Sequence, residues 1–480
     1  MNAPSPLVAP VLTGHSRATA VRSGTTALTY ADLQGEIAAG CDALRRAGIG
    51  PGCRVALALP KSLNALRVIL ATLAAGAAYV PLNHRLTPAA LATILEDLRP
   101  DLLIAAPGAL AGQAERLPGL QITPHLDTTP ERLPGVAVQH DQPPDLAAIL
   151  FTSGSTGTPK GIMLSHDNIG CFATWAAREF ALGAADQVAS HAPFHFDLST
   201  FDIFATLATG ATLHLLDDAD AAFPGAVRRF IADAGITTWY SVPTALAQLQ
   251  SRGALAGLSS LRQVLFAGEV FPTPVLRQAM AALPAAGVAN LFGPTETNVC
   301  TFHRLASPPH DDTPIPIGIP CPHAGITLSA DGEIGVTGPG VMLGYWRQPA
   351  LTTASRIDGR PDSYRTGDFA TRRPDGALMF NGRRDHLVKL RGHRVELLAL
   401  EAVLQAHPAI AEAVAVVTGE RLAVAIIERS PIDDAALRNV IAACLVPAYQ
   451  PGSIIRLNTM PRSSNGKADR GALRVLAAGA

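Results

Sequence analysis

The sequence predicts an α/β fold in which a large N-terminal domain is followed by a smaller C-terminal one. The chain has 480 residues, which is too long for one ordinary hydrophobic core. Its hydrophobic content of 48% and its charged content of 16% are typical of a well-packed globular protein. Strand-like and helix-like runs alternate through the middle of the chain, and this alternation indicates a parallel sheet with helices on its faces.

The first clear strand is the apolar run 146–151, and the alternation continues after it. We expect further strands at 212–216, 236–242 and 261–267, and helices at 224–235 and 244–252. In such folds ligands gather at the carboxyl ends of the strands. The loop around Gly154, the turn 267–269 and the loop 292–295 all follow strands, so they can converge on one crevice.

The pattern restarts after Asp385 and predicts a separate small α/β domain. A hairpin-like region comes first, and a helix, two strands, a second helix and a last strand follow at 397–406, 411–417, 422–427, 434–445 and near 454. We therefore expect one domain at residues 1–384 and another at 385–480.

Composition and charge argue against several classes of function. The net charge of −1 and the pI of about 6.9 predict no basic face for nucleic acid or for an anionic membrane. The longest apolar stretch, 68–82, contains Gly76 and Pro81 and is too short to span a bilayer, and the N-terminus has no signal-peptide pattern. The six cysteines lack the spacing of a zinc site or a disulfide framework. We expect a cytoplasmic protein that binds neither nucleic acid nor membrane.

The most informative segment follows the first clear strand and reads Leu150-Phe-Thr-Ser-Gly-Ser-Thr-Gly-Thr-Pro-Lys-Gly161. Its small residues let backbone N–H groups approach an anion, its hydroxyls add donors, and Lys160 adds a positive charge. This chemistry suits the phosphates of a nucleotide, and a solvated surface loop is the plain alternative. The segment is not a Walker A motif, because Pro159 stands where that motif requires glycine.

Four further motifs follow this loop along the chain. They are Asn290-Leu-Phe-Gly-Pro-Thr-Glu-Thr297, Tyr364-Arg-Thr-Gly-Asp368, Gly382-Arg-Arg-Asp-His-Leu-Val-Lys-Leu-Arg-Gly-His-Arg-Val-Glu396 and Pro461-Arg-Ser-Ser-Asn-Gly-Lys467. In this order, the five motifs resemble those of the adenylate-forming enzymes, which include acyl-CoA synthetases, luciferases and the adenylation domains of nonribosomal peptide synthetases. Weaker matches at 28–33 and 73–83 extend the resemblance over nearly the whole chain.

The resemblance implies a layered α/β N-terminal domain with a small β-barrel, and a mobile C-terminal lid hinged at Asp385. It also implies ATP and Mg²⁺. Thr295 would contact the α-phosphate, and Glu296 would hold Mg²⁺, a cation that prefers carboxylate oxygen. The alternative is that Glu296 is simply an acidic residue near the start of a helix, which is a common placement. The residues implied to hold the β- and γ-phosphates are Thr152, Ser153, Ser155, Thr156 and Lys160.

Other nucleotide contacts are implied further along. Phe292 would stack on adenine, at a place where the family usually has tyrosine. Asp368 would accept hydrogen bonds from both ribose hydroxyls, or it is a simple turn residue. Arg383 would add a second nucleotide contact, or it is an exposed cation. Lys467, taken alone a solvated tail charge, would bridge the substrate carboxylate and a phosphate in the transition state. The lid would then rotate so that loop 389–393 helps a phosphopantetheine thiol attack.

The segment His195-Phe-Asp-Leu-Ser-Thr-Phe-Asp-Ile-Phe204 resembles the amino-acid-activating branch of the family. In that branch an aspartate, here Asp197, pairs with the substrate α-ammonium. The alternative is that Asp197 caps the following helix, a role that Ser199 could also fill. Eight apolar or weakly polar residues would line the pocket between Asp197 and Lys467, namely Leu198, Phe201, Tyr240, Leu265, Ala267, Leu291, Val299 and Cys300.

This pocket resembles that of free-standing L-prolyl-AMP ligases, except that Phe201 stands in place of leucine. The resemblance implies activation of L-proline and its transfer to the phosphopantetheine of a separate peptidyl- or acyl-carrier protein, for pyrrole-type secondary metabolites. No carrier-attachment segment is visible in the sequence, which favours a separate carrier. Because of Phe201, a small acyclic amino acid such as valine or alanine stays an alternative substrate.

Two other hypotheses remain. An acyl- or aryl-CoA synthetase would have no ammonium to bind, so Asp197 argues against it. A non-catalytic relative that only binds a nucleotide or a partner should have lost Lys160, Glu296, Asp368 or Lys467, and the sequence keeps all of them.

Overall fold

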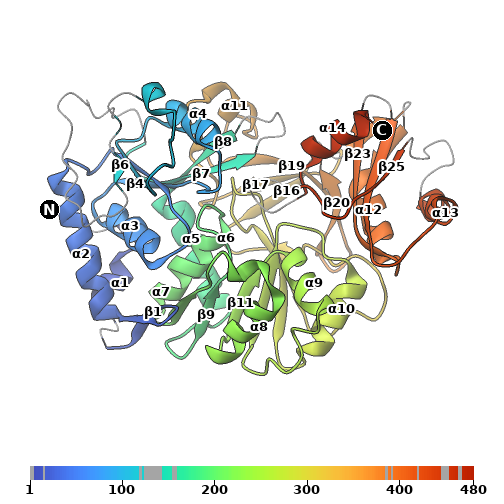
Figure 1. The fold of residues 1–480 in the computed structure, drawn as a ribbon, viewed down its shortest axis with the longest axis horizontal. Coiled ribbons are helices and arrows are strands. Elements are labelled where there is room, and N and C mark those ends of the chain that lie inside the picture. The colour runs from blue at the N-terminus through green and yellow to red at the C-terminus, as the bar shows by residue number, and fades with distance from the viewer. Residues whose placement is uncertain are drawn as a thin grey trace.

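The structure of the protein, a computed structural model, describes residues 5–14, 17–117, 120, 122–123, 143–153, 159–383, 387–390, 393–418, 421–444, 453–462 and 468–479. Ser155, Thr156, Asp385 and Lys467 lie outside these residues, and so does the side chain of Ser153. The described chain forms an α/β fold with five sheets, two of them large (Figure 1).

The largest sheet contains the parallel strands that the sequence predicts. In spatial order its strands are β15 (Ile319–Pro320), β14 (Thr301–Leu305), β13 (Gly287–Phe292), β12 (Gln263–Ala267), β11 (Thr238–Ser241), β9 (Gln187–Ser190), β10 (Thr212–Leu215), β1 (Thr19–Ser23) and β2 (Thr26–Thr29). Neighbours are parallel from β13 to β1 and antiparallel at both edges. The expected strands 212–216, 236–242 and 261–267 are confirmed as β10, β11 and β12.

The second large sheet carries the Gly/Ser/Thr-rich segment at its strand ends. Its order is β18 (Gly344–Tyr345), β8 (Pro159–Ser165), β7 (Leu146–Ser153), β4 (Ala78–Pro81), β3 (Arg54–Ala58), β5 (Leu102–Ala105) and β6 (Ile122–Thr123). Strands β7 to β6 are parallel, and β8 turns back antiparallel to β7. The predicted strand 146–151 is therefore β7, which continues to Ser153.

Helices form three layers around these two sheets (Figure 1). Between the sheets, α2 (Tyr30–Arg46), α3 (Leu63–Ala74) and α5 (His166–Glu179) pack in a core that both sheets share. The outer faces are covered by α4 (Pro88–Leu98) on one side and by α8 (Pro224–Asp233), α9 (Pro243–Ser251) and α10 (Thr273–Ala282) on the other. Thr29 with Asp32 and Ser165 with Asn168 form capping boxes that start α2 and α5.

A third, antiparallel sheet lies beyond β14 and carries the downstream motifs. Its strands are β16 (Gly325–Leu328), β17 (Glu333–Thr337), β19 (Ser363–Arg372) and β20 (Leu378–Arg383). The resemblance implied a small β-barrel at no stated position, and the described residues form this four-stranded sheet, which a single bridge between Gly318 and Leu378 extends. The short helix α11 (Pro349–Ala354) follows β18.

The C-terminal part has its own core at one end of the molecule (Figure 1). Its elements are β21 (Leu387–Leu390), β22 (His393–Glu396), α12 (Leu397–Ala406), β23 (Ile410–Thr418), β24 (Arg421–Glu428), α13 (Asp434–Cys444), β25 (Ser453–Arg456) and α14 (Arg470–Ala478). The two apolar clusters here contain no described residue before Leu397. The domain boundary at 384/385 falls outside the described residues and stays a prediction.

No helix in the described ranges is both long enough and apolar enough to cross a membrane.

Candidate active site

Glu296 lies at the centre of a hydrogen-bonded group that joins three parts of the fold. Its Oε1 accepts a hydrogen bond from the Tyr345 hydroxyl at 2.8 Å, and that hydroxyl lies 2.9 Å from the Tyr364 hydroxyl. Its backbone oxygen accepts from the N–H of Met342 at 2.7 Å. Burial, reinforced by the charge of Glu296, raises the pKa values of Tyr345 and Tyr364, so both stay neutral donors.

The turn that carries Thr295 and Glu296 requires glycine at its start. A Cβ on Gly293 would lie 1.8 Å from the backbone oxygen of Asn298, and Asn298 itself has a φ of 51°. The turn is not a helix, so Glu296 is not the acidic residue of a helix start. Asn298 donates to the Thr200 hydroxyl at 3.2 Å, which ties the turn to the segment after Asp197.

Asp368 and Arg383 face each other across neighbouring strands. They are direct partners in the β19–β20 pairing, and Nη1 of Arg383 lies 2.9 Å from Oδ1 and 3.0 Å from Oδ2 of Asp368. Asp368 is only 2% exposed and sits within β19, so it is not a simple turn residue. Arg383 is half-buried and paired, which also removes the alternative of an exposed cation.

Phe292 ends β13 close to the same strands. Its ring centroid lies 5.8 Å from that of Phe380 on β20, with an interplanar angle of 50°. The predicted adenine-stacking residue is therefore next to the strand that ends at Arg383. Phe380 is an aromatic neighbour that the motifs did not single out.

The described part of the predicted phosphate loop consists of its two strand ends. Thr152 on β7 pairs directly with Lys160 on β8, and the Lys160 ammonium lies 5.8 Å from the centre of the Tyr345 ring. Lys160 thereby comes close to the Glu296 group through Tyr345. Ser155 and Thr156 fall between these strand ends, outside the described residues.

The eight predicted lining residues of the amino-acid pocket all lie in one buried apolar cluster. They come from the helical segment after Asp197, from β11, β12 and β13, and from the turn after β13: Leu198, Phe201, Tyr240, Leu265, Ala267, Leu291, Val299 and Cys300. Tyr240 pairs with Leu265, and Ala267 with Leu291, on adjacent parallel strands. The rings of Phe201 and Tyr240 meet edge to face, 5.3 Å apart at 76°.

Asp197 stands at the helix start but does not cap it with its side chain. It precedes α6 (Leu198–Thr200), and its side chain makes no capping hydrogen bond. Ser199 does not take that role either, because its hydroxyl donates to the carbonyls of Phe194 and Phe196 at 3.1 and 2.6 Å. Burial, followed by the charge of Asp197, raises the pKa of Tyr240, one of the predicted lining residues.

A π-helical turn follows α6 and was not anticipated from the sequence. It spans Phe201–Ala205 (η2) and passes into α7 (Thr206–Ala208). Such turns are rare in proteins, but those that occur are often found at functional sites. Here the turn carries Phe201, and it also places Asp202 in the core with no exposed surface.

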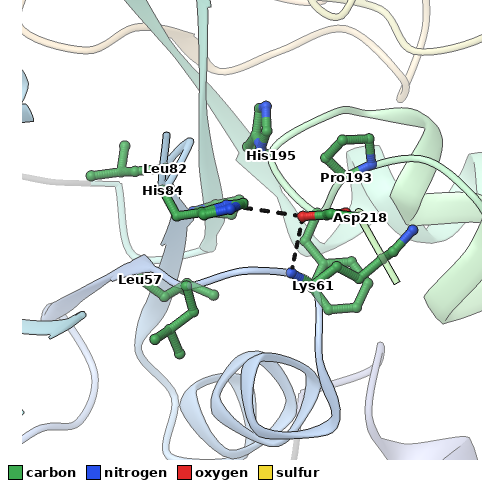
Figure 2. Close-up of a pocket in the computed structure, with 10 residues that line it drawn as sticks. Leu57, Lys61, Leu82, His84, Pro193, His195 and Asp218 are labelled. Carbon is green, nitrogen blue, oxygen red and sulfur yellow. Dashed lines mark hydrogen bonds and ion pairs between the residues drawn. The ribbon is translucent and has the colours of Figure 1, made fainter. Parts of the chain in front are cut away.

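A small pocket between the two large sheets brings together His195, which begins the segment 195–204, and residues that sequence reasoning missed. Leu57, Leu82, His84 and Lys61 from the second sheet's strand ends meet Pro193, His195 and Asp218, and Figure 2 shows the Asp218 carboxylate between His84 and Lys61. It has room for about one water molecule. Lys61 is only 7% exposed, but no motif contains it, so no signal in the sequence points to it.

The donor set around Glu296 fits a Mg²⁺ ion that is held mainly by a nucleotide. Across the ranges that the structure describes, no group of three or more His, Cys, Asp or Glu side chains could form a metal cage. Mg²⁺ commonly binds through one or two carboxylates together with substrate phosphates. Glu296, linked through Tyr345 to the strand ends that carry Thr152 and Lys160, offers such a carboxylate.

Known proteins resemble this chain over most of its length. A family model described as AMP-binding enzyme matches residues 10–346. The chain is 38% identical to an L-proline–[L-prolyl-carrier protein] ligase from Streptomyces coelicolor, over 93% of this chain and 91% of that protein. A ligase of the same name from Pseudomonas fluorescens is 36% identical, over 96% and 97%.

The fold agrees with these matches. ATP-bound MatB from Rhodopseudomonas palustris superposes with a TM-score of 0.85 at 25% identity, covering 99% of both chains. The matched residues include the Gly/Ser/Thr-rich segment, the turn with Glu296 and the helical segment after Asp197. The protein is thus an AMP-forming ligase that belongs to the AMP-binding enzyme family, the adenylate-forming enzymes that its motifs resemble.

Proposed function

We propose that this enzyme activates L-proline with ATP to form L-prolyl-AMP and passes the prolyl group to the phosphopantetheine thiol of a separate carrier protein. Two relatives that bear the name L-proline–[L-prolyl-carrier protein] ligase, each aligned over more than nine-tenths of this chain, support the proposal. The observation that carries it is the group of eight buried apolar or weakly polar residues on the helical segment after Asp197, on β11, β12 and β13, and on the turn after β13. A cluster of this kind suits a small apolar side chain, and Asp197 suits an α-ammonium group.

The amino-acid end of the site would be defined by the charge of Asp197 and by the shape of the apolar pocket. Asp197 pairs with the substrate ammonium, and its fixed place at the start of α6 sets the position of the α-carbon. The edge-to-face pair of Phe201 and Tyr240 forms a rigid wall against which a pyrrolidine ring packs. Leu265, Ala267 and Leu291, on adjacent strands, limit how far a side chain can extend.

In the first step an oxygen of the substrate carboxylate attacks the α-phosphorus of ATP, and the bond to the pyrophosphate oxygen breaks. Lys160, together with Thr152, Ser153, Ser155 and Thr156, holds the departing β- and γ-phosphates, and Thr295 contacts the α-phosphate. Glu296 would hold Mg²⁺, which would supply neutralisation of phosphate charge. Lys467 bridges the attacking carboxylate and the phosphate, where negative charge builds in the transition state.

The neighbours of these groups explain how they stay in place. Tyr345 and Tyr364 donate within the Glu296 group and fix the orientation of its carboxylate. Asp368 accepts from the ribose hydroxyls, and Arg383 across the strand pair fixes the orientation of that carboxylate. Phe292, packed beside Phe380, stacks on adenine.

In the second step the sulfur of the phosphopantetheine thiol attacks the acyl carbon, AMP leaves with the bonding electrons, and the thiol proton is released. The C-terminal part, residues 385–480, acts as the lid that changes position between the two steps, with Asp385 as its hinge. Its separate apolar core supports this proposal, because a unit with its own core can move as a body.

Amino-acid-dependent ATP–pyrophosphate exchange tests the first step. The full chain is assayed with all proteinogenic amino acids and with D-proline, pipecolate and benzoate. We expect L-proline to give the dominant signal. Exchange with valine or alanine would keep the enzyme class and assign the difference to Phe201, whereas exchange only with acids that lack an α-amino group would overturn the role of Asp197.

The acceptor is tested separately by loading. A phosphopantetheine-bearing carrier protein and free CoA are each offered to the enzyme with radiolabelled proline and ATP. We expect label on the carrier protein and little on CoA. Efficient formation of prolyl-CoA would instead place the enzyme with the CoA synthetases.

A further inference from the structure

Lys61 is a buried cation whose hydrogen bonds link the two large sheets. It lies three residues after β3 of the second sheet, and it is 7% exposed. Its ammonium donates to the carbonyl oxygens of Ser190 and His191, each at 2.7 Å, and lies 3.5 Å from that of Ala192. Ser190 is the last residue of β9 in the largest sheet. His191 and Ala192 follow it and begin the chain segment that leads to Asp197.

The segment 190–197 is held at three successive points. Lys61 holds its first residues, and the Ser199 hydroxyl donates to the carbonyls of Phe194 and Phe196 in its middle. The Thr200 hydroxyl donates to the Asp197 carbonyl at its end, at 2.6 Å. Ser199 and Thr200 belong to the helix that follows, so Lys61 is the one of these three side chains that comes from the other sheet.

The surroundings of Lys61 keep the side chain in this place. Asp218 accepts from the Lys61 backbone N–H at 3.5 Å, and Figure 2 shows that contact with Pro193 and His195 lining the same pocket. Burial lowers the pKa of Lys61 to about 8, and the charges of Asp218, Asp202 and Asp217 act in the opposite direction. The ammonium is therefore still mostly protonated at pH 7, and its bonds to the carbonyls are charge-assisted.

We propose that Lys61 is a positioning residue for the amino-acid site, because it fixes the segment that carries Asp197 to the opposite sheet. The inference rests on the proposed function of Asp197. Without the ammonium, three carbonyls lose their shared donor, and the segment gains freedom at its start. Asp197 would then meet the substrate ammonium less often in the right place, while the nucleotide side, built on β19, β20 and the Glu296 turn, keeps its contacts.

The test compares KM values in ATP–pyrophosphate exchange for three variants of the full chain. Lys61→Met keeps the length of the side chain and removes the donor, and Lys61→Arg restores a charged donor. Arg54→Met is the matched control, because Arg54 is a buried cation at the other end of β3 that donates to the backbone carbonyl of Arg99. The melting temperature of each variant is measured alongside.

We expect Lys61→Met to raise the KM for the amino acid about tenfold, because the variant loses a charge-assisted hydrogen bond. Its KM for ATP should stay within twofold of the wild-type value. Lys61→Arg should recover part of the amino-acid KM. Arg54→Met should lower the melting temperature and leave the amino-acid KM near that of the wild type. Equal changes in both KM values for Lys61→Met, or no change in either, would show that Lys61 only stabilises the fold.

A double-mutant cycle gives a sharper criterion. If Lys61 acts through Asp197, adding Lys61→Met to Asp197→Ala should raise the amino-acid KM little further. Additive effects would overturn the inference. Should Lys61→Met not fold, Lys61→Gln keeps a neutral donor, and its amino-acid KM must still rise more than its ATP KM. Failure of the proposed function is recognised separately, because wild-type enzyme would then show no amino-acid-dependent exchange.

Discussion

The nucleotide side and the amino-acid side of the candidate site are built in different ways. On the nucleotide side, polar groups from separate strands meet in pairs, such as Asp368 with Arg383 and Glu296 with Tyr345. On the amino-acid side, one sheet, one helical segment and the turn after β13 supply a buried apolar wall, with Asp197 as its proposed charged group. In the proposed site, nucleotide binding would therefore depend on individual hydrogen bonds, and amino-acid selection would depend on shape plus a single ion pair.

This difference predicts two signatures in variants. Loss of a polar nucleotide contact should weaken every amino-acid substrate equally, because the ligand it touches is common to all of them. Loss of an apolar wall residue should change the ratio between amino acids and leave the nucleotide untouched. Apolar pockets distinguish one methylene by only about 1–3 kcal/mol, so these ratios are modest.

Lys467→Ala should have the largest effect, because this lysine is proposed to act on both ligands at once. We expect the exchange rate to fall by roughly 10²–10³, the typical loss when one group that stabilises transition-state charge is removed. ATP binding, measured by equilibrium dialysis, should stay largely intact. Exchange near the wild-type rate would show that another cation does this work and that the two sides are not bridged by Lys467.

Asp197→Ala should separate the two sides most clearly. Removing one partner of a buried, hydrogen-bonded charge pair costs about 2–5 kcal/mol, which corresponds to a rise of roughly 30-fold or more in the amino-acid KM. The KM for ATP should stay within twofold. Cyclopentanecarboxylate, which lacks the amino group, serves as the comparison substrate, and a variant that still prefers proline to it would remove the ammonium argument.

The residues of the proposed nucleotide side could be predicted from sequence motifs because their chemistry is local, and their roles stay predictions. Hydroxyls, glycines and charges stand at fixed spacings in the Gly/Ser/Thr-rich segment and around Glu296, and the strands that carry them alternate visibly with helices. The alternation also predicted β10, β11 and β12 within a few residues. The sequence pattern did not predict the antiparallel strands at the edges of the largest sheet. Pairing at an edge depends on contacts between strands that are distant in the sequence.

The positions that sequence reasoning missed depend on long-range contact. Lys61 is 129 residues from the carbonyl of Ser190 that it contacts, and its segment has no distinctive pattern. Phe380 is recognisable only from its place beside Phe292. The π-helical turn at Phe201–Ala205 escaped notice because its residues are ordinary helix residues and the extra residue is accommodated by packing.

Asp368→Asn should weaken the nucleotide side alone. The amide replaces a carboxylate that is proposed to accept from two ribose hydroxyls, and it leaves Arg383 without its counter-charge, so the KM for ATP should rise about 10–100-fold. The rise should be the same for every amino acid tested. In the wild type ATP should be preferred to 2′-deoxy-ATP, and in the variant this preference should shrink; an unchanged preference would place the ribose anchor elsewhere.

Phe201→Leu should have the smallest effect on rate and the clearest effect on selectivity. It restores the leucine typical of L-prolyl-AMP ligases and opens space beside Tyr240, so kcat/KM for proline should change only a few-fold while pipecolate gains about tenfold relative to proline. Phe204→Leu is the matched control, because Phe204 lies on the same π-helical turn but packs against Tyr79. If Phe204→Leu shifted the pipecolate-to-proline ratio as much as Phe201→Leu, selectivity would depend on the stability of the turn and not on the wall that Phe201 forms.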